Sequence, residues 1–195
     1  MSALALVAWL CAAGTPDPHA HHTAVEADAP ASESLYQLDA TWTDAAGKPV
    51  KLAAFRGQPV VLAMIYTSCQ AVCPLLVSDV QKIERALSKP ARAKVRFVLV
   101  SFDPARDTPA KLQQYAKARG LPAERWSLLT GDDDAVRDLA AALGMRYRPS
   151  GGGDFAHSNL ISVLDGRGVV VARQVGLGQD PAPVVKTLGE LASKP

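Results

Sequence analysis

The stretch QPVVLAMIYTSCQAVCPLLVSDV, residues 58–80, decides the fold class of this chain. Gln58 to Tyr66 contain a continuous apolar run, which is typical of a strand buried on both faces of a sheet. From Pro74 to Leu87 the apolar residues recur at helical spacing instead. Cys69 and Cys73 lie between the two segments. The stretch therefore predicts a strand followed by a helix, with two thiols at the junction.

The rest of the chain continues this alternation of strands and helices. We expect further strands at residues 95–102, 126–130, 159–165 and 168–174, and further helices at residues 107–119, 132–143 and 183–192. The last two strands flank a turn at Gly166 and Arg167 and should form a hairpin. This order predicts a three-layer α/β domain, with helices on both faces of a central mixed sheet and a C-terminal β-hairpin.

Composition limits the class of protein. The chain has 195 residues, of which 48% are hydrophobic and 21% charged, so it can form one domain with a sizeable core. Its formal net charge is only +2, and no basic cluster or stripe is present in the sequence. Because nucleic-acid binding needs such a positive surface, we expect no nucleic-acid partner.

The N-terminal residues differ from the remainder. Residues 1–13 are interpreted as a signal peptide or the remnant of an N-terminal anchor, and residues 14–34 as a disordered, histidine-containing linker. Residues 35–195 then form the folded domain. Cys11 is either lipidated or removed with its segment. An exported domain would work in the periplasm or on the outer face of the cytoplasmic membrane, where disulfide bonds persist.

The linker holds three of the four histidines of the chain. His19, His21 and His22 are either residues of a solvated linker or a mobile arm that captures metal ions. The sequence does not favour one of these interpretations.

The cysteine pair suits two kinds of chemistry. Pro74 is favoured in the first turn of a helix, which predicts that Cys73 is the N-cap and that Cys69 lies in the preceding turn. The positive end of a helix dipole favours thiolate, which both attacks disulfides and binds metals. The pair has three intervening residues, whereas thioredoxin-type oxidoreductases have two. Disulfide formation between these cysteines stays open.

The remaining histidine, His157, is the candidate third ligand. It lies directly before a predicted strand and follows a glycine-rich loop at residues 150–154. Two thiolates and one imidazole form a soft set of ligands that suits copper(I). A single histidine is more often a surface or hydrogen-bonded residue, so this interpretation depends on the cysteine pair.

Four stretches together resemble the Sco/SenC family of copper-handling proteins. They occur in the order found in that family and are TSCQAVCP at residues 67–74, VSFDPARDTP at 100–109, WSLLTG at 126–131 and HSNLISVLDGRG at 157–168. The resemblance implies a thioredoxin-like fold, association with the outer side of the cytoplasmic membrane, and copper bound by two cysteines and one histidine. Carried over by position, these ligands are Cys69, Cys73 and His157.

The sequence departs from the family at two positions beside these residues. Gln70 follows the first cysteine, where the family often has proline, and Ala156 precedes the histidine, where it often has aspartate. A carboxylate that orients the imidazole is therefore missing or supplied differently, with Asp154 nearby in the sequence.

The leading functional hypothesis is a copper chaperone rather than an enzyme. The resemblance implies delivery of copper to a respiratory copper enzyme, such as the dinuclear copper site of cytochrome c oxidase, with an upstream copper donor as a further partner. The alternative is a thiol–disulfide reductase that acts on the cysteines of that copper site. Ser158 stands where thioredoxins have a cis-proline before the late strand, which counts against the alternative. Asp103 and Asp107 are interpreted as turn-forming and helix-capping residues, and Met64 as core.

Overall fold

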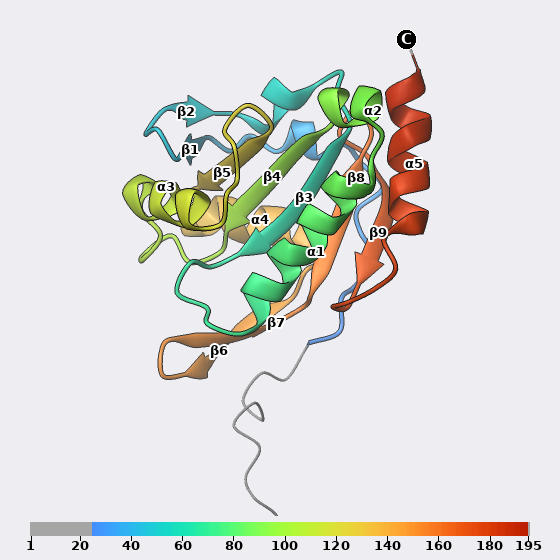
Figure 1. Cartoon of the computed structure of the whole chain (residues 1–195). Coiled ribbons are helices and arrows are strands. Elements are labelled where there is room, and N and C mark those ends of the chain that lie inside the picture. Colours follow the sequence, from blue (N-terminus) through green and yellow to red (C-terminus); the bar gives the residue numbers. More distant parts are fainter. Residues whose placement is uncertain (1–24, 195) are drawn as a thin grey trace, which may run out of the picture.

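A computed structural model of the chain describes residues 25–194. The interpretations of residues 1–13, Cys11, His19, His21 and His22 concern positions outside these described residues. Figure 1 shows an α/β domain in which the strands alternate with helices along most of the chain.

The central sheet is mixed and, within the described residues, has seven strands in the order β2-β1-β5-β4-β3-β8-β9. The three central strands β3, β4 and β5 are parallel, whereas β1, β8 and β9 run antiparallel to their neighbours. The bounds of these strands are Trp42–Asp44 (β1), Pro49–Val50 (β2), Val60–Ile65 (β3), Arg96–Ser101 (β4), Trp126–Thr130 (β5), Leu160–Leu164 (β8) and Val170–Val175 (β9).

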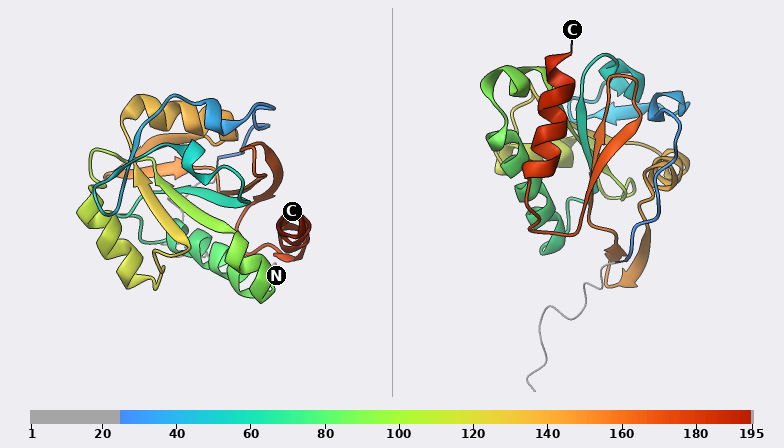
Figure 2. Two further views of the ribbon diagram at one scale, coloured as in Figure 1. Left: turned by 90° about the horizontal axis from the view of Figure 1, so that it is seen from above. Right: turned by 90° about the vertical axis from the view of Figure 1, so that its right-hand side faces the viewer.

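Helices cover both faces of this sheet, as Figure 2 shows from above. Helices α1 (Val72–Ala86), α3 (Pro109–Ala118) and α5 (Ala182–Ser193) lie on one face, and α4 (Asp133–Leu143) lies on the other. A short helix, α2 (Lys89–Lys94), follows α1, and 3-10 turns occur at Leu35–Gln37 and Leu52–Phe55. The expected three-layer arrangement, with a mixed sheet flanked by helices, is confirmed.

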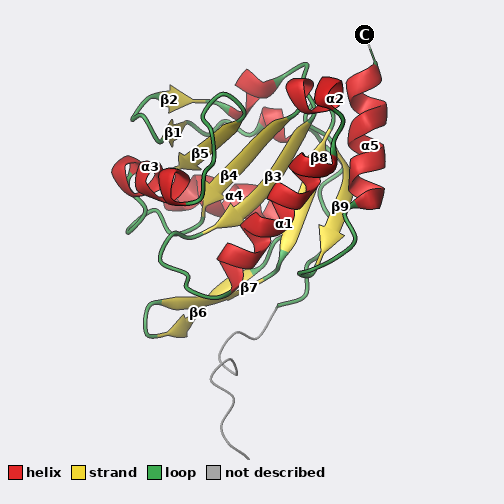
Figure 3. Cartoon of the chain, viewed as in Figure 1, coloured by secondary structure: helices red, strands yellow, loops and turns green. Residues whose placement is uncertain are grey.

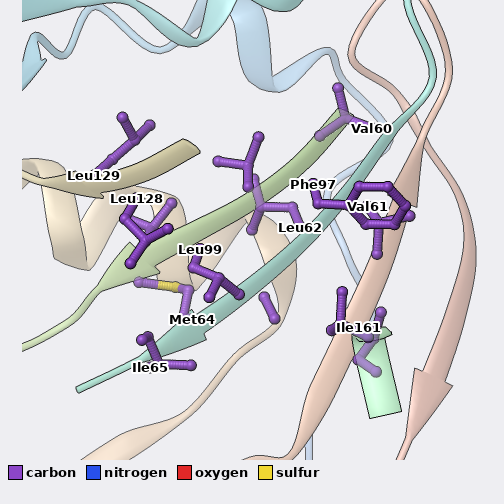
Figure 4. Packing of buried hydrophobic residues seen from close by; sticks show 14 of the residues in the cluster. Val60, Val61, Leu62, Met64, Ile65, Phe97, Leu99, Leu128, Leu129 and Ile161 are labelled. Carbon is purple, nitrogen blue, oxygen red and sulfur yellow. The ribbon is translucent and has the colours of Figure 1, made fainter. Parts of the chain in front are cut away.

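The core is built on the central strands. Every residue of β3 is buried, and Figure 4 shows its side chains beside buried apolar side chains of β4, β5 and β8. Met64 lies in this cluster with 3% of its surface exposed, as the apolar pattern predicted. Phe97 stacks on Trp126 with the ring centroids 5.0 Å apart. Two apolar faces per strand explain why these segments read as unbroken apolar runs rather than as alternating ones.

Some elements of the structure were not expected from the sequence. Strands β1 and β2 are only three and two residues long, too short to give a periodic signal. A second, two-stranded sheet pairs β6 (Tyr147–Gly151) with β7 (Asp154–His157). The glycine-rich segment that looked like a loop is therefore the tip of a hairpin, and Gly152 and Gly153 at this tip have positive φ. Figure 3 shows this hairpin projecting from the edge of the domain.

Part of the segment interpreted as a linker is bonded to the domain. Residues 25–34 follow the face that carries α4, where Asp28 N donates to Gly144 O at 2.8 Å and Ala31 N donates to Ala142 O at 2.8 Å. The backbone N–H groups of Asp28 and Ala31 thus have partners in the last turn of α4 and at its C-cap, Gly144. Among the described residues, no helix combines the length and the apolar character needed to cross a membrane.

Candidate functional site

The two cysteines lie at the start of α1, but their roles differ from those expected. Helix α1 begins at Val72 with Ala71 as its N-cap, so Cys73 is a first-turn residue and not the cap. The side chain of Ala71 cannot accept a hydrogen bond, and the sulfur of Cys69 accepts the backbone N–H of Cys73 instead, at 3.3 Å. Cys69 Sγ thus satisfies one of the free N–H groups that every helix start leaves. Cys69 and Cys73 are both free thiols in the structure.

His157 reaches the cysteines because β8 is antiparallel to β3. The register pairs Ala63 with Ile161, so the start of β8 lies at the edge of the sheet where β3 ends. His157 is the last residue of β7, three positions before β8. Its Nε2 atom lies 3.8 Å from Cys73 Sγ. The cysteines and the histidine are all buried, with 4% or less of their surface exposed.

A backbone carbonyl orients the imidazole. His157 Nδ1 lies 3.1 Å from the carbonyl oxygen of Ser158, an atom that can only accept a hydrogen bond. Nδ1 therefore carries the proton in the neutral ring, and the lone pair of Nε2 faces the sulfur of Cys73. This contact supplies the orientation that the aspartate often found before the histidine would provide. Asp154 does not replace that aspartate, because its carboxylate accepts a hydrogen bond from the hydroxyl of Tyr66 at 3.3 Å.

The two thiols have different acidities. The hydrogen bond from the Cys73 side chain lowers the pKa of Cys69, and together with the backbone N–H groups of Cys73 and Ala71 it outweighs the opposing effect of burial. Burial raises the pKa of the Cys73 thiol well above its ordinary value, and the adjacent Cys69 thiolate raises it further. These opposite pKa shifts favour thiolate on Cys69 and a protonated thiol on Cys73 in the metal-free state.

Aromatic side chains enclose the imidazole. Phe102, at the end of β4, lies 5.2 Å from the His157 ring and 5.2 Å from the Tyr66 ring, measured between centroids. Phe155 of the β6–β7 hairpin packs edge-on against both Tyr66 and Phe102. Arg106 contacts the hairpin at two points. Its guanidinium donates a hydrogen bond to Gly153 O and lies 5.6 Å from the centroid of the Phe155 ring. Water is thereby largely excluded from the thiols and the imidazole.

The buried carboxylate of Asp107 contacts the turn that carries Cys69. Asp107 is completely buried and accepts hydrogen bonds from both the backbone and the hydroxyl of Thr67. The helix-capping role expected for Asp107 is wrong, because Thr108 caps α3 with its hydroxyl. Asp103, interpreted in the same way, pairs with Arg106 and accepts the turn N–H groups of Arg106 and Asp107 on its carbonyl oxygen.

The site can hold a soft metal ion, although it is not a preformed cage. Among residues 25–194, no three His, Cys, Asp or Glu side chains already stand in a metal-binding arrangement. The separation of 3.8 Å between Cys73 Sγ and His157 Nε2 nevertheless fits an ion between them.

Fold and site together define a class of protein: a thioredoxin-like domain with a thiol pair and one imidazole at the strand–helix junction. The SCO1/SenC family profile matches residues 29–193 of the chain. The chain therefore belongs to the SCO1/SenC family.

Individual relatives agree with this assignment. A protein of Bacillus subtilis described as a SCO1 protein homolog is 24% identical over 147 residues, which cover 72% of this chain and 74% of the relative. The structure of Bradyrhizobium japonicum ScoI with copper bound is 27% identical, with a TM-score of 0.65, covering 78% of this chain and 96% of that one. A SCO1/SenC family lipoprotein from Bacillus anthracis shares the fold, with a TM-score of 0.73 at 23% identity and coverage of 82% and 96%.

Proposed function

We propose that this protein is a copper chaperone that holds copper(I) through Cys69, Cys73 and His157. The observation that carries the proposal is the approach of the His157 ring to the thiol pair, with Nε2 at 3.8 Å from Cys73 Sγ and its lone pair facing that sulfur. The copper-bound Bradyrhizobium relative supports the choice of metal. Two thiolates and one imidazole favour copper(I) over harder ions, which prefer oxygen ligands.

Binding would complete the ligand set rather than fill a rigid cavity. Cys69 already has thiolate character, whereas Cys73 holds its proton through burial. A cation placed between the sulfurs replaces that proton, so binding releases about one proton per ion near neutral pH. The imidazole supplies the third ligand through Nε2, while Nδ1 keeps its contact with the carbonyl of Ser158.

Delivery would proceed by ligand exchange with a partner. The three ligands are buried, so a copper-enzyme subunit must bring its own thiolates or imidazoles to the edge of the sheet and displace them one at a time. A cytochrome c oxidase subunit with a dinuclear copper site is the proposed client, in the periplasm or on the outer face of the cytoplasmic membrane. An upstream copper donor would load the protein.

Anaerobic competition against a copper(I) chelator tests the proposal on the reduced full-length chain. We expect about one copper(I) per chain. Each of Cys69→Ala, Cys73→Ala and His157→Ala should reduce the copper(I) affinity by more than about tenfold. Even the loss of a residue that only hydrogen-bonds to a metal ligand typically lowers metal affinity by about 10- to 100-fold. The matched control is the triple variant His19→Ala, His21→Ala, His22→Ala, which removes three imidazoles that are not part of the proposed ligand set. Wild-type affinity in His157→Ala would refute the three-ligand site.

A thiol–disulfide reductase is the second candidate, because one thiol of the pair has a lowered pKa. In this reaction a thiolate attacks a client disulfide, a mixed disulfide forms, and the other cysteine releases the reduced client while the pair becomes oxidised. Rapid reduction of a protein disulfide by metal-free His157→Ala, without any copper affinity in wild type, would favour this candidate over the chaperone.

A further inference from the structure

We propose that Asp107 is a positioning residue that fixes the turn carrying Cys69 through its hydrogen bonds to Thr67. For copper binding, the inference rests on the proposed function. For the redox equilibrium of the cysteine pair, it stands on the geometry alone.

The contacts of Asp107 join two parts of the chain that are far apart in sequence. Its Oδ2 atom accepts the backbone N–H of Thr67 at 2.9 Å and the hydroxyl of Ser101 at 2.6 Å, while Oδ1 accepts the hydroxyl of Thr67. Asp107 itself is held in place, because its own N–H donates to Asp103 O at 2.9 Å. The carboxylate therefore forms a fixed bridge between the end of β4 and the turn that follows β3.

Because Asp107 is buried, the loss of any of these hydrogen bonds is costly. None of its surface is exposed, and none of the ion pairs formed by residues 25–194 includes it. A buried carboxylate without a cationic partner is costly unless donors satisfy its oxygens. Two of its three donors come from Thr67. Movement of Thr67 would leave this charge poorly satisfied, so the folded state strongly favours one position of Thr67.

Fixing Thr67 fixes Cys69, which is only two residues away. The intervening turn is tight, since Cys69 N donates back to Tyr66 O at 3.4 Å. Tyr66 is completely buried, so the turn has a rigid support on its other side. The sulfur of Cys69 is then aimed at the N–H of Cys73. Without the hydroxyl contact the turn would have one anchor fewer, and the sulfur would sample orientations away from Cys73 and His157.

The test compares Thr67→Val, Thr67→Ser and Ser88→Ala. Thr67→Val keeps the shape and the backbone contact but removes the hydroxyl, whereas Thr67→Ser keeps the hydroxyl. Ser88→Ala is the matched control for lost stability, because it removes the side-chain cap of α2 at the opposite end of the domain (Figure 1). Two quantities are measured: copper(I) affinity against a chelator, and the reduction potential of the metal-free Cys69–Cys73 pair in a glutathione redox buffer.

We expect Thr67→Val to weaken copper(I) binding by about 10- to 100-fold, as for other outer contacts of metal sites. It should also shift the reduction potential of the pair. Thr67→Ser should match wild type in both readouts, and Ser88→Ala should match it despite lower stability. Asp107→Asn, which removes one acceptor, should behave like Thr67→Val if it folds. An unchanged potential in Thr67→Val, or an equal loss of affinity in Ser88→Ala, would overturn the inference.

The two readouts separate this inference from the proposed function. If wild type binds no copper(I), the chaperone proposal fails. The shift in reduction potential of Thr67→Val then still supports the positioning role, and the absence of a shift still refutes it.

Discussion

Cys73 Sγ and His157 Nε2 lie 3.8 Å apart, although 84 positions separate the two residues along the chain. The start of α1 and the end of β7 meet because β8 runs antiparallel to β3 and begins where β3 ends. The orientation of the imidazole follows from its hydrogen bond to Ser158, and the unequal acidities of the two thiols follow from local hydrogen bonds and burial. The site can therefore be tested piece by piece in the metal-free protein.

The contact with the Ser158 carbonyl predicts a single tautomer of His157. In the neutral ring, Nδ1 should carry the proton and Nε2 should be unprotonated, because the carbonyl oxygen cannot donate. Nitrogen-15 NMR of the reduced, metal-free protein distinguishes the two nitrogens by their chemical shifts. The opposite tautomer, with the proton on Nε2, would contradict the orientation described for the imidazole.

The lowered pKa of Cys69 and the raised pKa of Cys73 predict two thiols that titrate differently. In the reduced, metal-free protein at about pH 7, we expect one thiolate, on Cys69, because the hydrogen bond from Cys73 lowers its pKa. The ultraviolet absorbance of thiolate, followed against pH, reports this. Cys69→Ala should lack the band at neutral pH, since burial keeps Cys73 protonated. Cys73→Ala removes the donor and should raise the pKa of Cys69. Two ordinary titrations in wild type, both near pH 8.5, would disprove the asymmetry.

The contacts of Arg106 predict that it holds the β6–β7 hairpin over the site. Arg106→Ala removes the hydrogen bond to Gly153 O and the contact with the Phe155 ring. Hydrogen exchange of the amides in residues 154–157 should become faster, by roughly tenfold if the lost contacts are worth about 1.4 kcal/mol. Arg148→Ala, at an exposed position of the same hairpin, is the control. Equal protection in both variants would show that the aromatic packing alone holds the hairpin.

The β8–β9 turn predicts a pH-dependent stability. Asp165 is buried enough to raise its pKa, but the backbone N–H of Val169 and the groups of Arg167 donate to it, and the net effect lowers the pKa. A lowered folded pKa gives stability that is present above the unfolded value of about 3.9 and is lost as the pH falls through the folded value.

Asp165→Asn should therefore lower the free energy of unfolding by about 1–3 kcal/mol at neutral pH, and the difference from wild type should shrink on acidification below about pH 4. Urea denaturation at several pH values measures this. The exposed Asp138→Asn provides the comparison. A difference that stays constant down to about pH 2 would mean that the charge of Asp165 has no part in its contribution.

Local patterns were sufficient for most of the fold. The unbroken apolar run before Tyr66 identified β3, and the spacing after Pro74 identified α1, because burial on two faces or on one helical stripe leaves a regular mark on the sequence. The hairpin of β8 and β9 followed from its turn. Short or glycine-rich elements such as β1, β2 and the β6–β7 pair were missed, since they are stabilised by contacts with distant segments and carry no period of their own.

The same division holds for the site. The sequence by itself determined which residue types were available: one thiol pair after a buried strand and one histidine in the folded domain. Only the tertiary structure decided that the pKa of Cys69 is lowered and that of Cys73 is raised, because that depends on which sulfur accepts the helix N–H and which is more deeply buried. It also decided that Asp107 faces Thr67 instead of capping a helix. Contacts between distant segments depend on the direction of the strands and on how the layers pack. No local sequence pattern encodes either of these, so such contacts could not be predicted from the sequence.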